Sequence, residues 1–149
     1  MNERYEGKYL AMYEMLKQMS AYYLDACEYQ QKFIETAIGA ALFYLPRRKN
    51  LHYSGFISPE ALDTGKECEE HMFPRKIAAE ALLTTVPDTI EELEHVCNTL
   101  YLRFHIVTPE QNTRLRPYQK REVFTTPTAA YEKAGISLIE DPRRLCLTK

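Results

Sequence analysis

The first forty-five residues constrain the fold more than any other stretch of the chain. Between Lys8 and Ile38 the sequence contains neither proline nor glycine. Apolar side chains recur there every three or four residues, the spacing of one face of an α-helix. The recurring positions are Tyr9, Met12, Tyr13, Leu16, Met19, Tyr23, Ala26 and Cys27. The pattern predicts a helical segment from about Glu6 to Leu45.

A segment of this length without internal caps predicts either a coiled coil or two helices. Two helices are favoured, with a bend near Ser20 to Asp25, because Ser and Asp prefer helix starts. The part from Ala37 to Leu45 is apolar nearly all round, which indicates burial in a core or against a partner subunit. Pro46 then ends the helix. A homodimer through the N-terminal helices is therefore one expected form of the protein.

Length and composition favour one soluble domain, residues 1–149, with a helical segment over 1–46. The chain has 149 residues, 45% of them hydrophobic and 27% charged, and no apolar run approaches the ~20 residues that span a bilayer. The four cysteines form no CxxC pair, and the N-terminus lacks the pattern of a secretory signal. We expect a cytoplasmic protein with reduced thiols and no membrane partner.

The later elements are predicted from caps and from short apolar runs. Ser58 and Thr108 each precede a proline, the order of an N-cap and a first helical residue. The expected helices begin at Ser58, Ile77, Asp88, Thr108 and Thr128, and the expected strands are Cys68–Phe73, Tyr101–Val107 and a small edge strand within Ile136–Ile139. The predicted fold class is α+β and mostly helical, with a small element of two strands and a helix over residues 66–122.

The stretch from Glu67 to Lys76 carries three acids, a histidine and two cations within ten residues. Hydrolysis of a phosphodiester needs a base for the attacking water, a divalent cation and cationic side chains that hold the backbone. His71 suits the first task, and Glu70 offers an oxygen ligand. Net charge also differs along the chain, from −2 over residues 1–45 to +4 over 101–149. The C-terminal third is thus the better candidate for contact with phosphate.

These residues resemble the ββα-metal motif of HNH, or His-Me finger, nucleases, including small phage and bacterial proteins. The resemblance is carried by Glu70-His71-x-x-Pro74 and by Asn112 in the helix expected after the second strand. It implies cleavage of DNA, rather than RNA, with His71 as general base and with Mg²⁺ or Mn²⁺ held by Glu70 and Asn112. The expected phosphate-binding residues are Arg75, Lys76, Arg114, Arg116, Arg47 and Arg48.

Two other interpretations remain open. The chain departs from the family pattern because two predicted helices separate His71 from Asn112 and no histidine follows Asn112. A non-catalytic helical module that binds protein or DNA is the main alternative. A structural zinc site from Cys68, His71, His95 and Cys97 is the other. There is no P-loop, GxSxG or GxGxxG motif.

Overall fold

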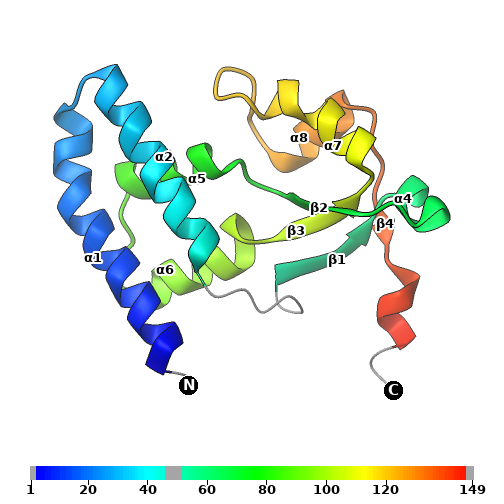
Figure 1. Cartoon of the computed structure of the whole chain (residues 1–149), viewed down its shortest axis with the longest axis horizontal. Helices are drawn as coiled ribbons and strands as arrows, with labels where there is room; N and C mark the ends of the chain where they lie inside the picture. Colours follow the sequence, from blue (N-terminus) through cyan, green and yellow to red (C-terminus); the bar gives the residue numbers. More distant parts are fainter. Residues whose placement is uncertain (1–2, 46–51, 147–149) are drawn as a thin grey trace. The chain divides into compact units, whose positions relative to one another are not determined.

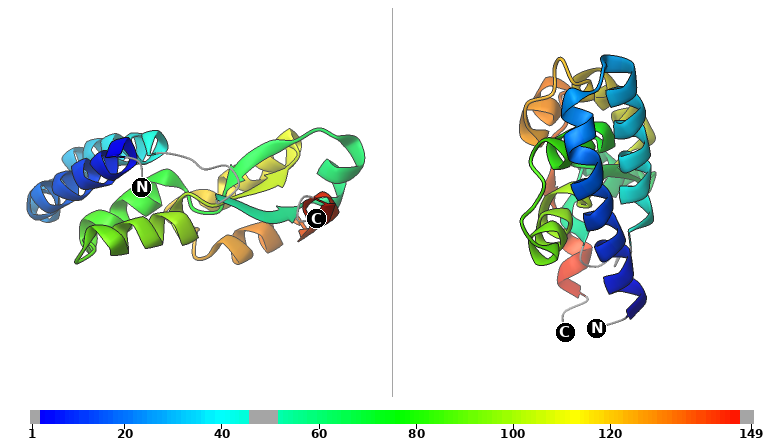
Figure 2. Two further views of the ribbon diagram at one scale, coloured as in Figure 1. Left: turned by 90° about the horizontal axis from the view of Figure 1, so that it is seen from below. Right: turned by 90° about the vertical axis from the view of Figure 1, so that its left-hand side faces the viewer.

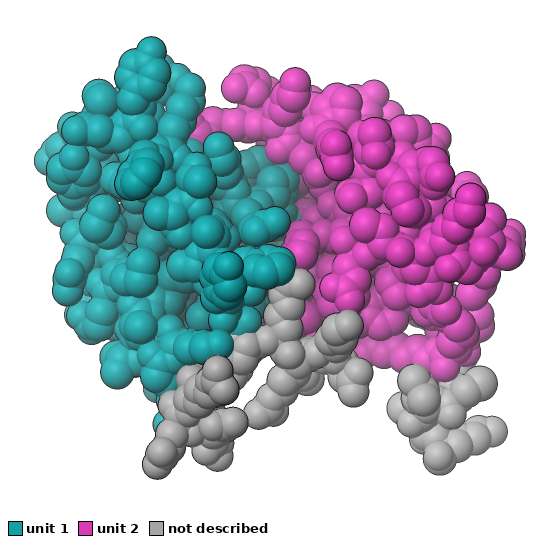
Figure 3. Space-filling model, viewed as in Figure 1, with its two compact units in different colours: residues 1–48, 73–102 teal, residues 49–72, 103–149 magenta. Residues whose placement is uncertain are grey.

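The chain forms two compact units. The structure, a computed structural model, describes residues 3–45 and 52–146. Unit 1 consists of Met1–Arg48 and Phe73–Leu102, and unit 2 of Lys49–Met72 and Arg103–Lys149 (Figure 3). The expected element over residues 66–122 is therefore interrupted, because its segment 73–102 belongs with the N-terminal helices. Each unit has its own hydrophobic core.

Unit 1 begins with two helices that lie side by side, α1 (Glu3–Asp25) and α2 (Glu28–Tyr44) (Figures 1 and 2). The expected pair of helices is confirmed, and the break falls directly after Asp25, at the end of the stretch from Ser20 to Asp25 in which a bend was expected. Gln30 fixes the start of α2 because its side-chain oxygen accepts the Cys27 N–H at 3.0 Å. A buried hydrogen bond of 2.7 Å from the Tyr23 hydroxyl to Glu35 Oε1 joins the two helices.

The rest of unit 1 closes the core over α1 and α2. Helix α5 spans Arg75–Thr84 and α6 spans Ile90–Val96, and a π-helical turn, η1, continues to Tyr101. Thr89 caps α6, accepting the Glu92 N–H at 3.1 Å, where the sequence indicated Asp88. Apolar side chains of all these elements meet in one cluster, which includes Leu16, Ile38, Leu82, Leu83, Leu93 and Cys97.

Unit 2 is built on a four-stranded mixed sheet in the order β2-β3-β1-β4. The strands are β1 (Tyr53–Ile57), β2 (Cys68–His71), β3 (Phe104–Val107) and β4 (Ile139–Glu140). Strand β3 runs antiparallel to β2 and parallel to β1, and β4 is antiparallel to β1. Strand β2, strand β3 and the helix after β3 therefore form the expected ββα order.

Short capped helices complete unit 2. They are α4 (Pro59–Thr64), α7 (Pro109–Leu115) with the 3₁₀ turn η2 (Arg116–Gln119), α8 (Pro127–Lys133) and the 3₁₀ turn η3 (Pro142–Cys146). The predicted caps are confirmed at Ser58 and Thr108. Gly135 follows α8 with a φ of 66°, a value that favours glycine. Val107, Leu115, Ala130 and Tyr131 lie in the core cluster of this unit.

Two features of the sheet differ from the sequence-based expectation. Strand β1 was not expected, because Gly55 lies at its centre with a φ of 85° and the pairing register shifts there. Strand β3 begins at Phe104 rather than Tyr101 because η1 extends through Tyr101. The α+β class and the long N-terminal helical segment are confirmed.

Among the described residues, no helix is both long enough and apolar enough to cross a membrane.

Burial of α1 leads to a matched stability prediction. Leu16 is fully buried, whereas Leu10 of the same helix is 49% exposed. Leu16→Ala should lower the free energy of unfolding by about 2–5 kcal/mol, because it removes packed methyl groups and leaves a cavity. Leu10→Ala should change it by less than about 1 kcal/mol, since helix propensity changes little. Chemical denaturation followed by circular dichroism measures both, and equal effects would contradict the core assignment.

Candidate functional site

The pleat of β2 places the two adjacent candidate residues on opposite faces of the sheet. Successive side chains of a strand point to opposite sides. Glu70 pairs with His105 across the ladder and His71 pairs with Phe104. Glu70 therefore shares a face with His105, while His71 shares the other face with Phe104, whose ring stacks on Tyr53 at 5.5 Å between centroids. Neighbours in sequence are thus separated by the sheet.

Glu70 is a buried carboxyl group held by two donors from later in the chain. Its side chain accepts hydrogen bonds from the Tyr131 hydroxyl of α8 and from the Gln119 amide of η2, and the residue is 4% exposed. Burial raises the pKa of Glu70 from 4.5 to about 7, and the two hydrogen bonds oppose this shift. Glu70 thus ties the central sheet to both α8 and η2.

His105 lies beside Glu70 and is held in the neutral form. Ser54 Oγ lies 2.6 Å from His105 Nδ1, and the same oxygen accepts the Phe56 N–H at 3.1 Å. Ser54 and His105 therefore share one buried hydrogen bond, whose direction is set by the tautomer of the ring. Burial, with a smaller contribution from Arg103, lowers the pKa of His105 to about 4. The ring also meets Tyr131 edge-on, with 5.3 Å between centroids.

Asn112 contacts β2 at the end of the strand opposite to His71. Its side-chain nitrogen lies 3.5 Å from the Cys68 Sγ. Cys68 is three residues before His71, which corresponds to roughly 10 Å along a strand. The structure therefore does not bring His71, Glu70 and Asn112 together around one point.

The donor atoms do not fit a Mg²⁺ or Mn²⁺ site in this arrangement. Such ions require several oxygen ligands converging at about 2.0–2.2 Å. Both oxygens of Glu70 already accept hydrogen bonds, and Asn112 is turned to a sulfur atom. Over the described ranges, no group of three or more His, Cys, Asp or Glu side chains has a geometry that holds a metal ion.

The four residues of the alternative zinc site are divided between the two units. Cys97 is fully buried in the core of unit 1, where burial, with a smaller contribution from Glu94, raises its thiol pKa to about 12. His95 also belongs to unit 1, whereas Cys68 and His71 belong to unit 2. Cys97 is therefore a packing residue, as its position on the apolar side of α6 and η1 indicates.

The expected phosphate-binding cations are also divided. Arg75 and Lys76 begin α5 in unit 1, where the Arg75 guanidinium lies over the Phe43 ring at 5.0 Å from the centroid. Arg114 and Arg116 are exposed at the end of α7 and the start of η2 in unit 2. Arg47 and Arg48 lie outside the described residues.

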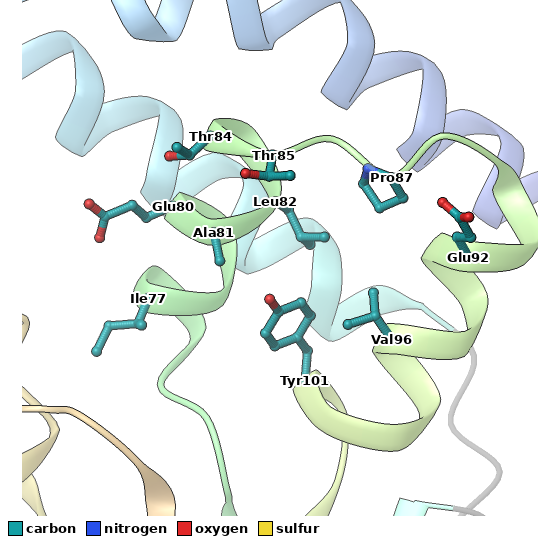
Figure 4. Close-up of a pocket in the computed structure, with 10 residues that line it drawn as sticks. All are labelled: Ile77, Glu80, Ala81, Leu82, Thr84, Thr85, Pro87, Glu92, Val96 and Tyr101. Carbon is teal, nitrogen blue, oxygen red and sulfur yellow. The ribbon is translucent and has the colours of Figure 1, made fainter.

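Each unit contains a cavity, and neither is suited to phosphate. The cavity in unit 1 measures about 570 Å³; Tyr101 projects into it, and Glu80 and Glu92 lie on opposite sides (Figure 4). The cavity in unit 2 measures about 350 Å³, is lined mainly by apolar side chains and contains His105, Tyr131 and Glu132. Carboxylates rather than cations line the edge of both cavities, which disfavours an anionic ligand.

Comparison of the chain with family models, curated proteins and solved structures finds no match. The assignment of a function therefore depends on the geometry of the chain itself.

Sequence reasoning missed the partners of Glu70. Gln119, Tyr131 and His105 carried no motif, and they lie 35 to 61 positions from Glu70. The one signal present was the alternation within β2, which sets Cys68 and Glu70 on one face. If a helix is expected to cover the face of β2 that carries Cys68 and Glu70, this alternation predicts that the Glu70 side chain is buried.

The raised pKa of Glu70 predicts a pH-dependent stability that Glu70→Gln removes. The folded state keeps a proton that the unfolded state releases at its ordinary pKa of 4.5. The stability contributed by Glu70 is therefore complete below that pH and is lost as the pH rises through about 7. The free energy of unfolding of Glu70→Gln relative to the parent should thus increase by up to about 3 kcal/mol between about pH 4.5 and 8.

Denaturant titrations of both proteins across this pH range measure the difference. Only the difference is informative, because the lowered pKa of His105 makes stability change with pH in the opposite direction. The stability contributed by His105 is complete above pH 6.5 and is lost as the pH falls towards about 4. Glu122→Gln removes the same charge from an exposed position and should give a nearly constant difference. A constant difference for Glu70→Gln would show that Glu70 is not a buried, protonated group.

Proposed function

We propose that the chain is a DNA-binding module that contacts the phosphate backbone through cations in the last turn of α7 and in the residues that follow it. The observation that carries the proposal is the exposed cluster of Arg114, Arg116, Lys120 and Arg121, here called the basic segment. Four cations within eight residues, against no acid in the same stretch, produce a local positive potential that attracts phosphate.

Three cations of the basic segment are available to an external anion. Among the described residues, Arg114, Arg116 and Lys120 have no ion-pair partner. Arg143 differs, because its guanidinium is already paired with Asp141 at 2.8 Å and with Glu67 at 2.5 Å. When unpaired exposed cations bind the phosphate backbone, they release the counterions condensed on it. This release is the main source of non-specific affinity for DNA.

The basic segment is also held in place from within unit 2. Tyr118 packs against the core cluster that contains Leu115 and Tyr131. Gln119, the next residue, donates its hydrogen bond to buried Glu70. Two inward contacts within the segment therefore fix the backbone while the cations on either side stay exposed. In this proposal Glu70 is a positioning residue that acts through Gln119.

Helix-dipole stabilisation explains only part of the cluster. A cation in the last turn stabilises a helix by about 0.3–1 kcal/mol, and Arg114 occupies the last turn of α7. Arg116 begins η2 and Lys120 follows it, so neither belongs to the last turn of α7. A role outside the fold accounts for these two cations better than helix capping does.

DNA cleavage, the activity implied by the HNH resemblance, is the second candidate. It is favoured by one observation, the succession of antiparallel β2 and β3 followed by α7, which contacts β2. It is disfavoured by the separation of His71 from Glu70 and Asn112 and by the occupied oxygens of Glu70. Binding without cleavage requires no such constellation, and for that reason we rank it first.

Removal of three cations should weaken DNA binding and reduce its salt dependence. For Arg114→Gln, Arg116→Gln and Lys120→Gln combined, the slope of log affinity against log salt should fall by up to about 3, as expected for three lost phosphate contacts. Fluorescence anisotropy with a labelled duplex at several salt concentrations measures it. The matched control, Lys8→Gln, Lys17→Gln and Lys32→Gln, removes the same charge from α1 and α2. Equal slopes for the two triple variants would overturn the proposal.

A plasmid assay separates the two candidate functions. We expect supercoiled DNA to remain intact with the parent protein in the presence of Mg²⁺ or Mn²⁺, because the donor atoms do not converge on one point. Metal-dependent nicking by the parent that is lost in His71→Ala would instead establish cleavage. Purification of the variant beside the parent, with circular dichroism of both, excludes misfolding and contaminating nuclease as explanations.

A further inference from the structure

Helix α2 is apolar on the face that points away from its own core. Its inward positions, including Ile34, Ile38 and Leu42, pack in unit 1 against α1 and α5 (Figures 1 and 2). The outward positions form what we call the outer stripe, and all of them are exposed. The stripe consists of Tyr29, Phe33, Thr36, Ala37, Ala40 and Tyr44. An outward helix face on a monomer is normally charged or polar.

The outer stripe exposes more aromatic surface than a solvated helix face normally does. Tyr29 is 84% exposed, Phe33 is 77% exposed and Tyr44 is 71% exposed. No Lys, Arg, Asp or Glu interrupts the stripe. Glu28 and Lys32 flank it and form an ion pair of 2.6 Å with each other along the same helix. Contiguous exposed apolar surface of this kind marks an interaction site.

The order of side chains in the outer stripe identifies the partner. The residues of the stripe fall in pairs that are equidistant from the midpoint between Thr36 and Ala37. The symmetric pairs are Tyr29 with Tyr44, Phe33 with Ala40, and Thr36 with Ala37. A second α2 laid antiparallel over the first would therefore set each Phe33 against an Ala40 on both sides of the midpoint, and each Tyr29 against a Tyr44 at the ends of the contact. This is the self-complementarity that a two-fold interface requires.

We propose that the protein forms a homodimer in which the outer stripes of two α2 helices pack antiparallel about a two-fold axis at Thr36 and Ala37. Small residues at the centre allow the helix axes to approach to about 8–10 Å. In the same register Lys32 falls opposite Ala41, so no like charges meet. The proposal is independent of DNA binding, and its test contains no nucleic acid.

The area of the outer stripe is adequate for a reversible dimer. Three aromatic side chains bury on the order of 450 Å² per copy, and a standard interface buries about 800 Å² per partner. The stripe extends over about 22 Å of helix, and about 900 Å² in total is the size of a weak, transient interface. The expected dimer is thus one that dissociates on dilution.

Sedimentation velocity of the full chain tests the proposal. The mass should rise from 17.4 kDa towards twice that value over about a hundredfold increase in concentration. Phe33→Glu should weaken the dimer by more than about tenfold, because it buries an unpaired charge in each half of the interface. Val123→Glu, at an exposed apolar position of unit 2, should leave it unchanged. Circular dichroism establishes that each variant is folded.

A charge pair tests the antiparallel register. The double variant Phe33→Glu with Ala40→Lys should restore the dimer, because the carboxylate introduced at position 33 of each copy would face the ammonium group introduced at position 40 of the other. A parallel pair would instead set the two introduced carboxylates against each other. A parent that remains monomeric at all concentrations, or a Phe33→Glu variant that dimerises as the parent does, would overturn the proposal. Failure of the double variant to recover the dimer would overturn the antiparallel arrangement.

Discussion

Unit 2 depends on a carboxyl group that has been removed from water. Glu70 lies on the face of the sheet covered by α7 and α8, and the donors that compensate its burial come from η2 and α8. A buried polar group without partners costs several kcal/mol, so Gln119 and Tyr131 must be in place whenever the sheet is formed. The position of η2, and with it the proposed DNA-binding cations, therefore follows from the desolvation of one side chain.

The local elements of this fold were predictable, whereas the contacts that join them were not. Ser58, Thr108 and Gly135 mark helix ends through bonds made within a few residues, and such signals can be read directly from sequence. Strand β1 was missed because Gly55 weakens any strand pattern and only pairing with β3 and β4 compensates for it. The partners of Glu70 were missed for the same reason, since hydrogen bonds across some fifty residues leave no periodic trace.

The candidate site shows how adjacency in sequence differs from adjacency in space. Glu70 and His71 suggested a metal ligand and a general base in one site because they are neighbours in the chain, yet neighbours in a strand point to opposite faces. The ββα order that the HNH resemblance implied is present in β2, β3 and α7, and this order alone does not assemble a metal site. The ββα order of elements is set by the hydrophobic pattern and the turns. A metal site also requires donor atoms that have no competing hydrogen-bond partner.

Helix α2 illustrates a further ambiguity of sequence patterns. A segment that is apolar all round predicts burial on every side, but it does not say which side is buried by the same chain. In this protein the core of unit 1 covers only the face that includes Ile38. The opposite face keeps three exposed aromatic side chains, whose removal from water is favourable by about 25 cal/mol per Å². A second copy offers the same surface in reverse order, so the chain itself provides a complementary cover for this face.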